Sequence, residues 1–467
     1  MSIQTVSRAR AVLGGSIGNL IEWYDFYCYS FFSLYFAKAF FPNASPTGQL
    51  LNAAAIFAGG FLVRPIGGWL MGVYADRAGR RAALVLAMLL MSGGSLVVAV
   101  CPTYTTAGVA APVILLAARV LQGVSLGGEY GASATYLSEI GTSRHRGFIG
   151  SFQYVTLVGG QLAASLTLLV LQSVLSAATL EAWAWRIPFA IGALLSLVAF
   201  WLRRGIPETE SFAHARRVQA PLRELWSHRR EVMLVIGLTM GGTAAFYVYT
   251  IYMPKLLTNS VGLSREMATV ISTASLFLFA LIQPVMGALS DVVGRRALLI
   301  GFGVLGTIGT IPLLGALGRA HGDPWAAFGL ILIALLILSG YTSINAVVKA
   351  ELFPAEIRAI GVALPYAIAA SVFGGTAEYV ALWLKDIGHE NWFAIYITIL
   401  IAGSLAVYVL MRDTRRTSRI DSERDLGEVD VAGLLRGQHE PGVHSAERAG
   451  LEIEGPFVSV HDRAGKR

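Results

Sequence analysis

The chain has 467 residues, of which 55% are hydrophobic and 14% are charged, and its formal net charge is +7. Soluble domains are about 45–50% apolar and about 25% charged, so this composition excludes an ordinary soluble enzyme, a disordered chain and a disulfide scaffold. In a soluble protein a net positive charge would suggest a nucleic-acid partner. In a chain this apolar, what the charge indicates depends on where the Lys and Arg residues lie relative to the apolar segments.

Long apolar runs recur along the chain and are separated by short polar segments. A helical membrane span needs about 20 apolar residues, and backbone groups in lipid must be paired internally, so runs of this length predict helices. We predict an all-α membrane protein with twelve spans. They cover residues 12–39, 50–75, 82–100, 112–138, 148–173, 186–202, 231–255, 266–290, 297–317, 325–349, 361–384 and 391–411. The first span has no cleavage-site pattern, so we expect it to be retained and not removed as a signal peptide.

The loops on one side of the predicted spans carry most of the positive charge. Connections 76–81, 139–147, 203–230, 291–296 and 350–360 contain 15 Lys and Arg residues, and the connections on the other side contain 5. Cytoplasmic loops carry an excess of Lys and Arg, so the first set and both termini are predicted to be cytoplasmic. The net charge therefore reports topology, and no nucleic-acid partner is expected.

The longest internal polar segment divides the spans six and six. This gives four predicted domains: an N-terminal six-helix bundle at 1–202, a cytoplasmic central loop at 203–230, a C-terminal six-helix bundle at 231–411 and a flexible cytoplasmic tail at 412–467. The tail is polar, with scattered Gly and Pro and no sustained heptad, which is typical of a solvated segment.

Charged residues inside the spans are functional candidates, because a charge at the bilayer centre costs at least ~2.5–3.5 kcal/mol. Glu22 and Asp25 are three residues apart on one face of the first span, and Glu129 lies in the fourth. A proton carrier needs a carboxyl whose surroundings change, because burial favours its protonated form and a neighbouring arginine its charged form. We predict that Glu22, Asp25 and Glu129 carry protons; for Glu22, a fixed salt bridge is the alternative.

Two arginines lie deep in the first half. Arg64 is near the middle of the second span and Arg119 is in the fourth. A guanidinium presents a fork that matches a carboxylate, so two separated arginines suit a dicarboxylate. The alternative is that Arg64 only neutralises Glu22 or Asp25.

The fourth span has two different faces. Arg119, Glu129 and the polar residues between them follow a three/four spacing, whereas Gly123, Gly127 and Gly131 repeat every four residues on a largely opposite side. We expect one face to line a wet cavity and the other to contact a neighbouring helix closely. Ten residues span ~15 Å of helix, so Arg119 and Glu129 cannot contact each other directly.

Uncharged polar residues in later spans complete the candidate substrate site. They are Tyr154, Gln161, Tyr249, Tyr341 and Asn345, each of which has helix contact as its alternative role. Lys349 is expected either to extend to the membrane interface or to attract anions. For Glu378 two roles are open: it lines the outer cavity, or it holds neighbouring helices together.

A loop pattern occurs twice along the chain. Gly72, Asp76, Arg80 and Arg81 follow the second span, and Gly287, Asp291, Arg295 and Arg296 follow the eighth, each offset by 215 residues. Glu139 and Arg146 recur as Glu351 and Arg358 with an offset of 212. Repeated six-helix halves with a site between them are a transporter architecture.

These loop residues predict a cytoplasmic latch. The glycines allow helix ends to approach, the aspartates cap helices or pair with arginine, and the arginines can pair with Glu139 or Glu351. The latch forms when the protein faces outward and breaks when it faces inward. The alternative is ordinary inside-positive charge.

The first loop motif resembles the signature of the major facilitator superfamily, G-x3-D-R-x-G-R-R, at residues 72–81. Four further stretches, at 18–27, 64–68, 119–129 and 185–189, resemble its metabolite:proton symporter family. The resemblance implies the major facilitator fold, in a multi-pass protein of a bacterial inner membrane. It also implies proton-coupled import of a small dicarboxylate such as α-ketoglutarate. The alternatives are another organic acid (citrate, succinate or a shikimate-like acid) or a zwitterionic osmolyte.

A membrane enzyme and a channel are the competing classes. All eight histidines fall outside the predicted spans, Cys28 and Cys101 lack metal-site spacing, and no P-loop or nucleophile–base pattern is present. We therefore expect no enzyme activity, no metal and no cofactor. Repeated halves with latch-like loops favour alternating access over a continuous pore. The expected partners are a small organic anion, protons and the lipid bilayer, and we expect a monomer.

Overall fold

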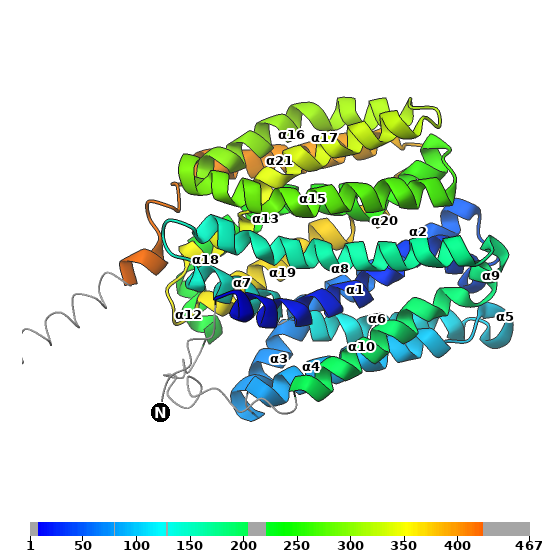
Figure 1. Cartoon of the computed structure of the whole chain (residues 1–467), viewed down its shortest axis with the longest axis horizontal. Helices are drawn as coiled ribbons and strands as arrows, with labels where there is room; N and C mark the ends of the chain where they lie inside the picture. Colours follow the sequence, from blue (N-terminus) through cyan, green and yellow to red (C-terminus); the bar gives the residue numbers. More distant parts are fainter. Residues whose placement is uncertain (1–7, 79, 128, 204–220, 424–467) are drawn as a thin grey trace, which may run out of the picture. The chain divides into compact units, whose positions relative to one another are not determined.

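A computed structural model of the protein describes residues 8–78, 80–127, 129–203 and 221–423, and every regular element among them is helical (Figure 1). This confirms the all-α prediction. The described residues up to Asp421 belong to one unit. We call residues 8–203 the first half and residues 221–411 the second half.

Ten α-helices are described in the first half: α5 and α9 are short connecting helices, and the other eight follow the predicted spans. They are α1 (Arg8–Phe40), α2 (Pro46–Leu62), α3 (Arg64–Ala78), α4 (Arg80–Val100), α6 (Ala110–Leu126), α7 (Glu129–Ile140), α8 (Arg146–Val174) and α10 (Ile187–Arg203). The connecting elements are α5 (Tyr104–Ala107), α9 (Ala177–Ala182) and the 3-10 turn η1 (Ala184–Arg186).

The second half repeats this pattern with more interruptions, because three π-helical segments lie within its spans. Its helices are α12 (Pro221–Ser227), α13 (Arg229–Tyr247), η2 (Val248–Tyr252), α14 (Met253–Leu256), η3 (Leu257–Val261), α15 (Arg265–Val293), α16 (Arg295–Gly318), α17 (Pro324–Thr342), α18 (Asn345–Leu352), α19 (Arg358–Ala369), η4 (Ala370–Gly375), α20 (Ala377–Asp386) and α21 (Asn391–Leu410).

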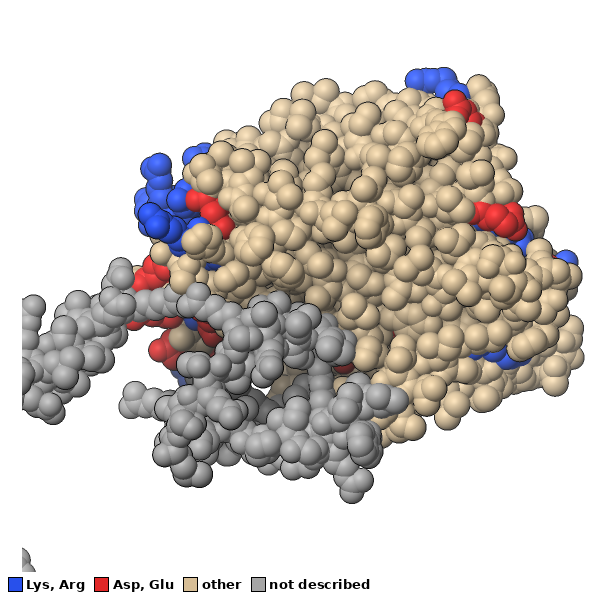
Figure 2. Space-filling view, in the orientation of Figure 1, with Lys and Arg blue, Asp and Glu red and all other residues tan. Residues whose placement is uncertain are grey.

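Each of the twelve predicted spans coincides with one helix or with a run of consecutive helices. Among the described residues, eight helical segments are long and apolar enough to cross a membrane, and shorter apolar helices cover 85–100, 110–126 and 184–197. On the part of the surface that grey atoms leave visible in Figure 2, charged side chains gather toward the two ends of the bundle. The broad band between them carries none, as expected for a belt in contact with lipid.

Several spans are broken in their middle. The second span breaks at Val63, immediately before Arg64 and Pro65; the fourth breaks after Leu126; and the tenth breaks between α17 and α18. Proline lacks a donor for the helical ladder, and π-helical turns widen it, so both interrupt regular helix. Broken helices in transporters expose backbone and side chains at the substrate site.

Glycine packing fixes the fourth span against the second. A Cβ at Gly123 would clash with the carbonyl oxygen of Gly60, and one at Gly127 would clash with that of Arg64. The glycine face predicted for the fourth span is therefore a close helix contact, which confirms that expectation. Across the halves, α8 runs alongside α15, as Figure 1 shows at the centre of the bundle.

Candidate functional site

Arg64 begins α3 in the interior of the bundle. Its side chain is 1% exposed, and its guanidinium carbon lies 5.0 Å from the ring centre of Trp23 and 4.8 Å from that of Phe61. Nε and Nη1 of Arg64 donate to no described residue. Among the described residues Arg64 forms no ion pair with Glu22 or Asp25. The structure therefore gives no support to a purely neutralising role.

Phenol groups from both halves surround this guanidinium. Tyr27 and Tyr130 of the first half and Tyr247 and Tyr366 of the second interact electrostatically with Arg64. Tyr130 and Tyr366 are stacked, with their ring centres 3.6 Å apart. Arg64 is thus placed at the contact between the halves, where groups from each can reach one ligand.

Lys349 of the second half is a second buried cation beside the same tyrosines. Its Nζ donates to Oδ1 of Asn345 at 2.6 Å and to the hydroxyl of Tyr130 at 3.4 Å, and it lies 4.0 Å from the ring centre of Tyr366. The residue is fully buried, so the expectation that Lys349 extends to the membrane interface is wrong. Its position follows from the break before α18, which turns Asn345 and Lys349 inward on consecutive turns.

Two buried cations therefore share one cluster of tyrosines. Within the described part of the chain, neither Arg64 nor Lys349 forms an ion pair, although Tyr130 interacts with both. An uncompensated buried charge costs several kcal/mol unless a partner is supplied. Such a site is suited to an anion with two negative groups, which would supply both partners.

Arg119 belongs to a different network inside the first half. Its Nη1 donates to Oε1 of Gln122 at 2.5 Å, and Nη2 donates to the carbonyl oxygen of Phe26 at 3.2 Å. Gln122 in turn donates to Oδ2 of Asp25 at 2.7 Å, and Ser95 also donates to that carboxyl. Gln122 thus links Arg119 to Asp25. The structure places Arg119 beside a proton-coupling candidate. The guanidinium carbon of Arg119 also lies 4.2 Å from the ring centre of Phe26, which is 5.9 Å from that of Arg64.

Of the other residues predicted for the substrate site, two lie at the tyrosine cluster and three lie at contacts between helices. Asn345 contacts Lys349, and Tyr154 interacts electrostatically with Tyr366 and Tyr130, so both lie at the tyrosine cluster. The remaining three contact neighbouring helices: Gln161 donates to Thr250 at 3.1 Å, Tyr249 to Thr310 at 3.3 Å, and Tyr341 pairs with Thr243 at 3.2 Å. Glu22 is 4% exposed in α1, and the side chain of Glu129 lies outside the described residues.

At one end of the bundle, which we call the latch end, ion pairs connect the two halves. Arg358 of the second half contacts Glu139 of the first at 2.6 Å, and Arg146 of the first contacts Glu351 of the second at 3.4 Å. The repeated acid–arginine loops therefore exchange partners, with each half supplying the acid for the other.

Asp291 and Arg295 strengthen this connection. Their ion pair measures 2.7 Å, and the Asp291 carboxylate also accepts hydrogen bonds from the backbone amides of Gly147 at 2.8 Å and Phe148 at 2.9 Å. A carboxylate at a helix N-terminus is stabilised by the helix dipole and by unpaired amides. Asp291 thus caps α8 of the other half.

The corresponding loop of the first half is less complete in the structure. The side chains of Asp76, Arg80 and Arg81 lie outside the described residues. A Cβ at Gly72 would meet no described atom within 4 Å, whereas one at Gly287 would clash with Gly147. The close helix approach expected at both glycines is therefore found only at Gly287, where α15 runs alongside α8.

Residues 412–421, which we call the strap, also contact the latch end. Arg146 donates from Nη1 and Nη2 to the Asp421 carboxylate at 2.8 and 2.6 Å, and Thr414 donates to Glu351 at 2.6 Å. The strap is the first part of the predicted tail. Its polar composition gave no signal of these contacts, because they depend on partners more than 60 residues away in sequence.

Toward the opposite end, a buried polar triad joins the halves. Lys255 of α14 pairs with Glu378 of α20, and Ser30 of α1 lies between them, donating to Glu378 at 3.0 Å and accepting from Lys255 at 2.8 Å. Both charged side chains are at most 3% exposed. In the predicted topology Lys255 is the last residue of the seventh span and the role of Glu378 is open, and the structure gives Glu378 a role in contact between the halves.

The triad predicts a clear stability pattern. Lys255→Met or Glu378→Gln alone leaves the other group buried without its partner, which costs about 3–5 kcal/mol. We expect each single variant to unfold at a lower temperature than the parent, and the double variant to recover most of the loss. Thermal unfolding of the purified proteins checks this, and a double variant as unstable as the sum of the singles contradicts it.

Comparisons with known proteins give the chain its relatives. A family model described as "Sugar (and other) transporter" matches residues 11–219 and 208–425. The chain is 50% identical over 420 residues to the alpha-ketoglutarate permease of Escherichia coli (strain K12), which covers 90% of this chain and 97% of the permease. It is 34% identical to the citrate-proton symporter of Salmonella typhi, over 79% of this chain and 86% of that protein. Among solved structures, a D-xylose-proton symporter has a TM-score of 0.70 at 20% identity, covering 86% of this chain and 98% of the other.

Proposed function

Because the chain belongs to the sugar (and other) transporter family of the major facilitator superfamily, we propose that it imports α-ketoglutarate with protons by alternating access. It is a proton-coupled metabolite transporter and not an enzyme. The observation that carries the proposal is the pair of buried cations, Arg64 and Lys349, one in each half and both without an acidic partner among the described residues.

The two carboxylates of the substrate are held at opposite sides of the tyrosine cluster. Arg64 takes one carboxylate through its unused Nε and Nη1, and Lys349 takes the other beside Asn345. The phenol hydroxyls of Tyr130 and Tyr366 supply further donors between the two cations. A ligand held from both halves is released when the halves separate on one side, as alternating access requires.

Other substrates fit this site less well. A zwitterionic osmolyte brings one carboxylate and one cation, so it leaves one of the two buried charges without a partner. Citrate, succinate and shikimate-like acids also carry carboxylates, and the number and spacing of those groups decide among them. The 50% identity to the permease favours α-ketoglutarate.

Proton coupling is assigned to Asp25, with Glu22 and Glu129 as further candidates. The Asp25 side chain is fully buried, and its hydrogen bonds to described residues come from the neutral groups of Ser95 and Gln122, with Arg119 on the other side of Gln122. A shift of α1 against α6 would change the distance between Asp25 and Arg119. Such a change loads or unloads a proton.

Contacts between the halves at the two ends of the bundle are proposed to close the two sides of the transporter in turn. The latch end is proposed to be the cytoplasmic side of a bacterial inner membrane, because the basic loops lie there, and both termini are then cytoplasmic. The six-helix halves are proposed to move as units, with 203–230 as the loop between them, in a monomer. The latch closes the cytoplasmic side, and the triad of Ser30, Lys255 and Glu378 closes the outer side.

Glu351→Gln tests the latch. The substitution removes the charge that Arg146 and Arg295 approach at 3.4 and 3.8 Å, so the cytoplasmic side opens more often. With Cys28 and Cys101 replaced by Ser, a cysteine introduced at buried Ser151 is expected to react with a polar maleimide roughly 10-fold faster.

Exposed Glu356 in the same loop is the matched control, and Glu356→Gln is expected to leave the labelling rate unchanged. Equal labelling rates in the parent protein and in Glu351→Gln would show that the ion pairs do not hold the halves together.

Uptake into proteoliposomes tests the function as a whole. With an imposed pH gradient, acid outside, labelled α-ketoglutarate is expected to accumulate above its external concentration. Unlabelled succinate, citrate and glycine betaine serve as competitors, and we expect α-ketoglutarate to compete best and betaine least. Uptake that is insensitive to the gradient, or stronger competition by betaine, contradicts the proposal.

A further inference from the structure

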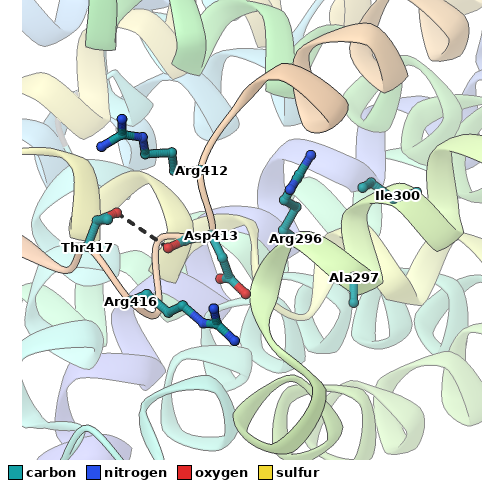
Figure 3. A pocket seen from close by; sticks show the side chains of 7 residues that line it. All are labelled: Arg296, Ala297, Ile300, Arg412, Asp413, Arg416 and Thr417. Atoms are coloured by element: carbon teal, nitrogen blue, oxygen red, sulfur yellow. Dashed lines mark hydrogen bonds between the residues drawn. The ribbon is translucent and has the colours of Figure 1, made fainter.

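A basic cavity lies where α16 begins and the strap leaves α21. It has a volume of about 530 Å³ and is lined by seven residues, which Figure 3 labels: Arg296, Ala297, Ile300, Arg412, Asp413, Arg416 and Thr417. We propose that this cavity binds the phosphate of an anionic phospholipid headgroup. Neither the transport site nor the latch uses its three arginines.

Two of the three arginines are available to a ligand. Arg412 and Arg416 are exposed, and their side chains donate to no described residue. Arg296 donates from Nε to the carbonyl oxygen of Tyr408 at 3.2 Å and from Nη2 to that of Val409 at 2.5 Å, which leaves Nη1. Guanidinium groups bind phosphate oxygens in a matching planar geometry.

The acidic residue in the cavity is already engaged. Oδ1 of Asp413 accepts hydrogen bonds from the backbone amides of Arg295 at 3.2 Å and Arg415 at 3.1 Å. Its carboxylate therefore caps the start of α16 and holds the strap in place. The lining keeps a net positive charge, with three guanidinium groups against one carboxylate.

The apolar wall indicates that the anion belongs to a lipid. Ala297 is exposed, and the exposed side chains of Val304, Leu305 and Ile308 continue along the same face of α16. Leu410, the last residue of α21, is 83% exposed beside the strap. These side chains form a surface on which an acyl chain can lie while its headgroup reaches the arginines. Basic pockets at the cytoplasmic ends of spans suit anionic lipid headgroups, and free phosphate would need no such wall.

Occupancy of this cavity would reach the latch through the strap. Arg412 and Arg416 alternate along the strap with Thr414, which donates to Glu351. Asp421 follows and contacts Arg146. A headgroup that holds Arg412 and Arg416 would therefore also hold the strap against the closed latch.

Native mass spectrometry of the full chain in mixed phosphatidylglycerol and phosphatidylcholine measures the binding. The test variant is Arg412→Gln/Arg416→Gln, and we expect it to retain phosphatidylglycerol about 25-fold less than the parent, at roughly fivefold per arginine. The matched control is Arg415→Gln, which removes the same type of charge from the strap but not from the cavity lining, and it should bind normally. Thermal unfolding gives a second measurement, since phosphatidylglycerol should stabilise the parent and the control but not the test variant.

Three results would overturn the proposal. One is equal retention of phosphatidylglycerol by the test variant and the control, and another is equal retention of phosphatidylcholine and phosphatidylglycerol by the parent. The third is displacement of the lipid by inorganic phosphate at millimolar concentration, which would assign the cavity to a soluble anion. Size-exclusion profiles and circular dichroism of each variant show that a loss of binding is not a loss of fold.

Discussion

Replacing Lys349 with Met is expected to weaken uptake of α-ketoglutarate strongly while making the protein more stable. The side chain is fully buried, and its ammonium contacts only Asn345 and two tyrosines, so it has no acidic partner among the described residues. A charge-assisted hydrogen bond contributes about 1.5–3 kcal/mol, so losing the substrate carboxylate's contact lowers the apparent affinity by roughly 10- to 100-fold.

The gain in stability separates a binding role from a structural one. An unpaired buried ammonium destabilises the protein without ligand, and an apolar side chain of similar length removes that cost. We expect the unfolding midpoint of Lys349→Met to rise by ~2–5 °C. Functional sites commonly carry such a trade-off between stability and activity.

Exposed Lys38, at the end of α1, is the matched control, and Lys38→Met is expected to leave the uptake kinetics unchanged. Dicarboxylate and monocarboxylate competitors sharpen the test, because only the second carboxylate contacts Lys349. The preference for the dicarboxylate should fall in Lys349→Met. Normal affinity for α-ketoglutarate in this variant, or a lower unfolding midpoint, would remove Lys349 from the binding site.

The helical architecture could be predicted from sequence because hydropathy and segment length determine it. Arg64 was also predictable, since a charge in the middle of an apolar run is conspicuous. Lys349 and Lys255 were not, because each lies near the end of its span, where hydropathy cannot distinguish an interfacial lysine from a buried one. The break at Ser343–Ile344 and the interrupted helix at 248–261 decide their burial. The first break contains no proline or glycine. The second contains Pro254, but the π-helical turns on both sides of it, which turn Lys255 inward, have no signal in the sequence.

The latch was also predictable only in part. The offset of 212 residues between the two acid–arginine pairs predicted equivalent loops in the two halves, and the structure adds that Glu139 pairs with Arg358 and Glu351 with Arg146. A repeat indicates which residues are equivalent, but the exchange of partners depends on how the halves face each other. The strap lies outside the repeated acid–arginine pairs, so the repeat could not indicate that Asp421 would contact Arg146.

Asp25→Asn is expected to abolish accumulation against a gradient while retaining exchange of substrate across the membrane. The amide keeps the size of the side chain and can still accept a hydrogen bond from Ser95 or Gln122, but it carries no titratable proton. The ratio of internal to external α-ketoglutarate under an imposed pH gradient should fall to about one, because each transport cycle no longer moves a proton through this residue.

Counterflow provides the second half of this test. Vesicles loaded with unlabelled substrate should still take up labelled α-ketoglutarate through Asp25→Asn at a rate within about threefold of the parent, since Arg64 and Lys349 are unchanged and the barrier rises by less than 1 kcal/mol. Asp323→Asn, at the exposed N-cap of α17, is the control that removes a carboxylate without affecting either measurement. Undiminished accumulation by Asp25→Asn would assign the coupling to Glu22 or Glu129. Loss of both accumulation and counterflow would instead make the contact of Asp25 with Gln122 a structural requirement of the first half.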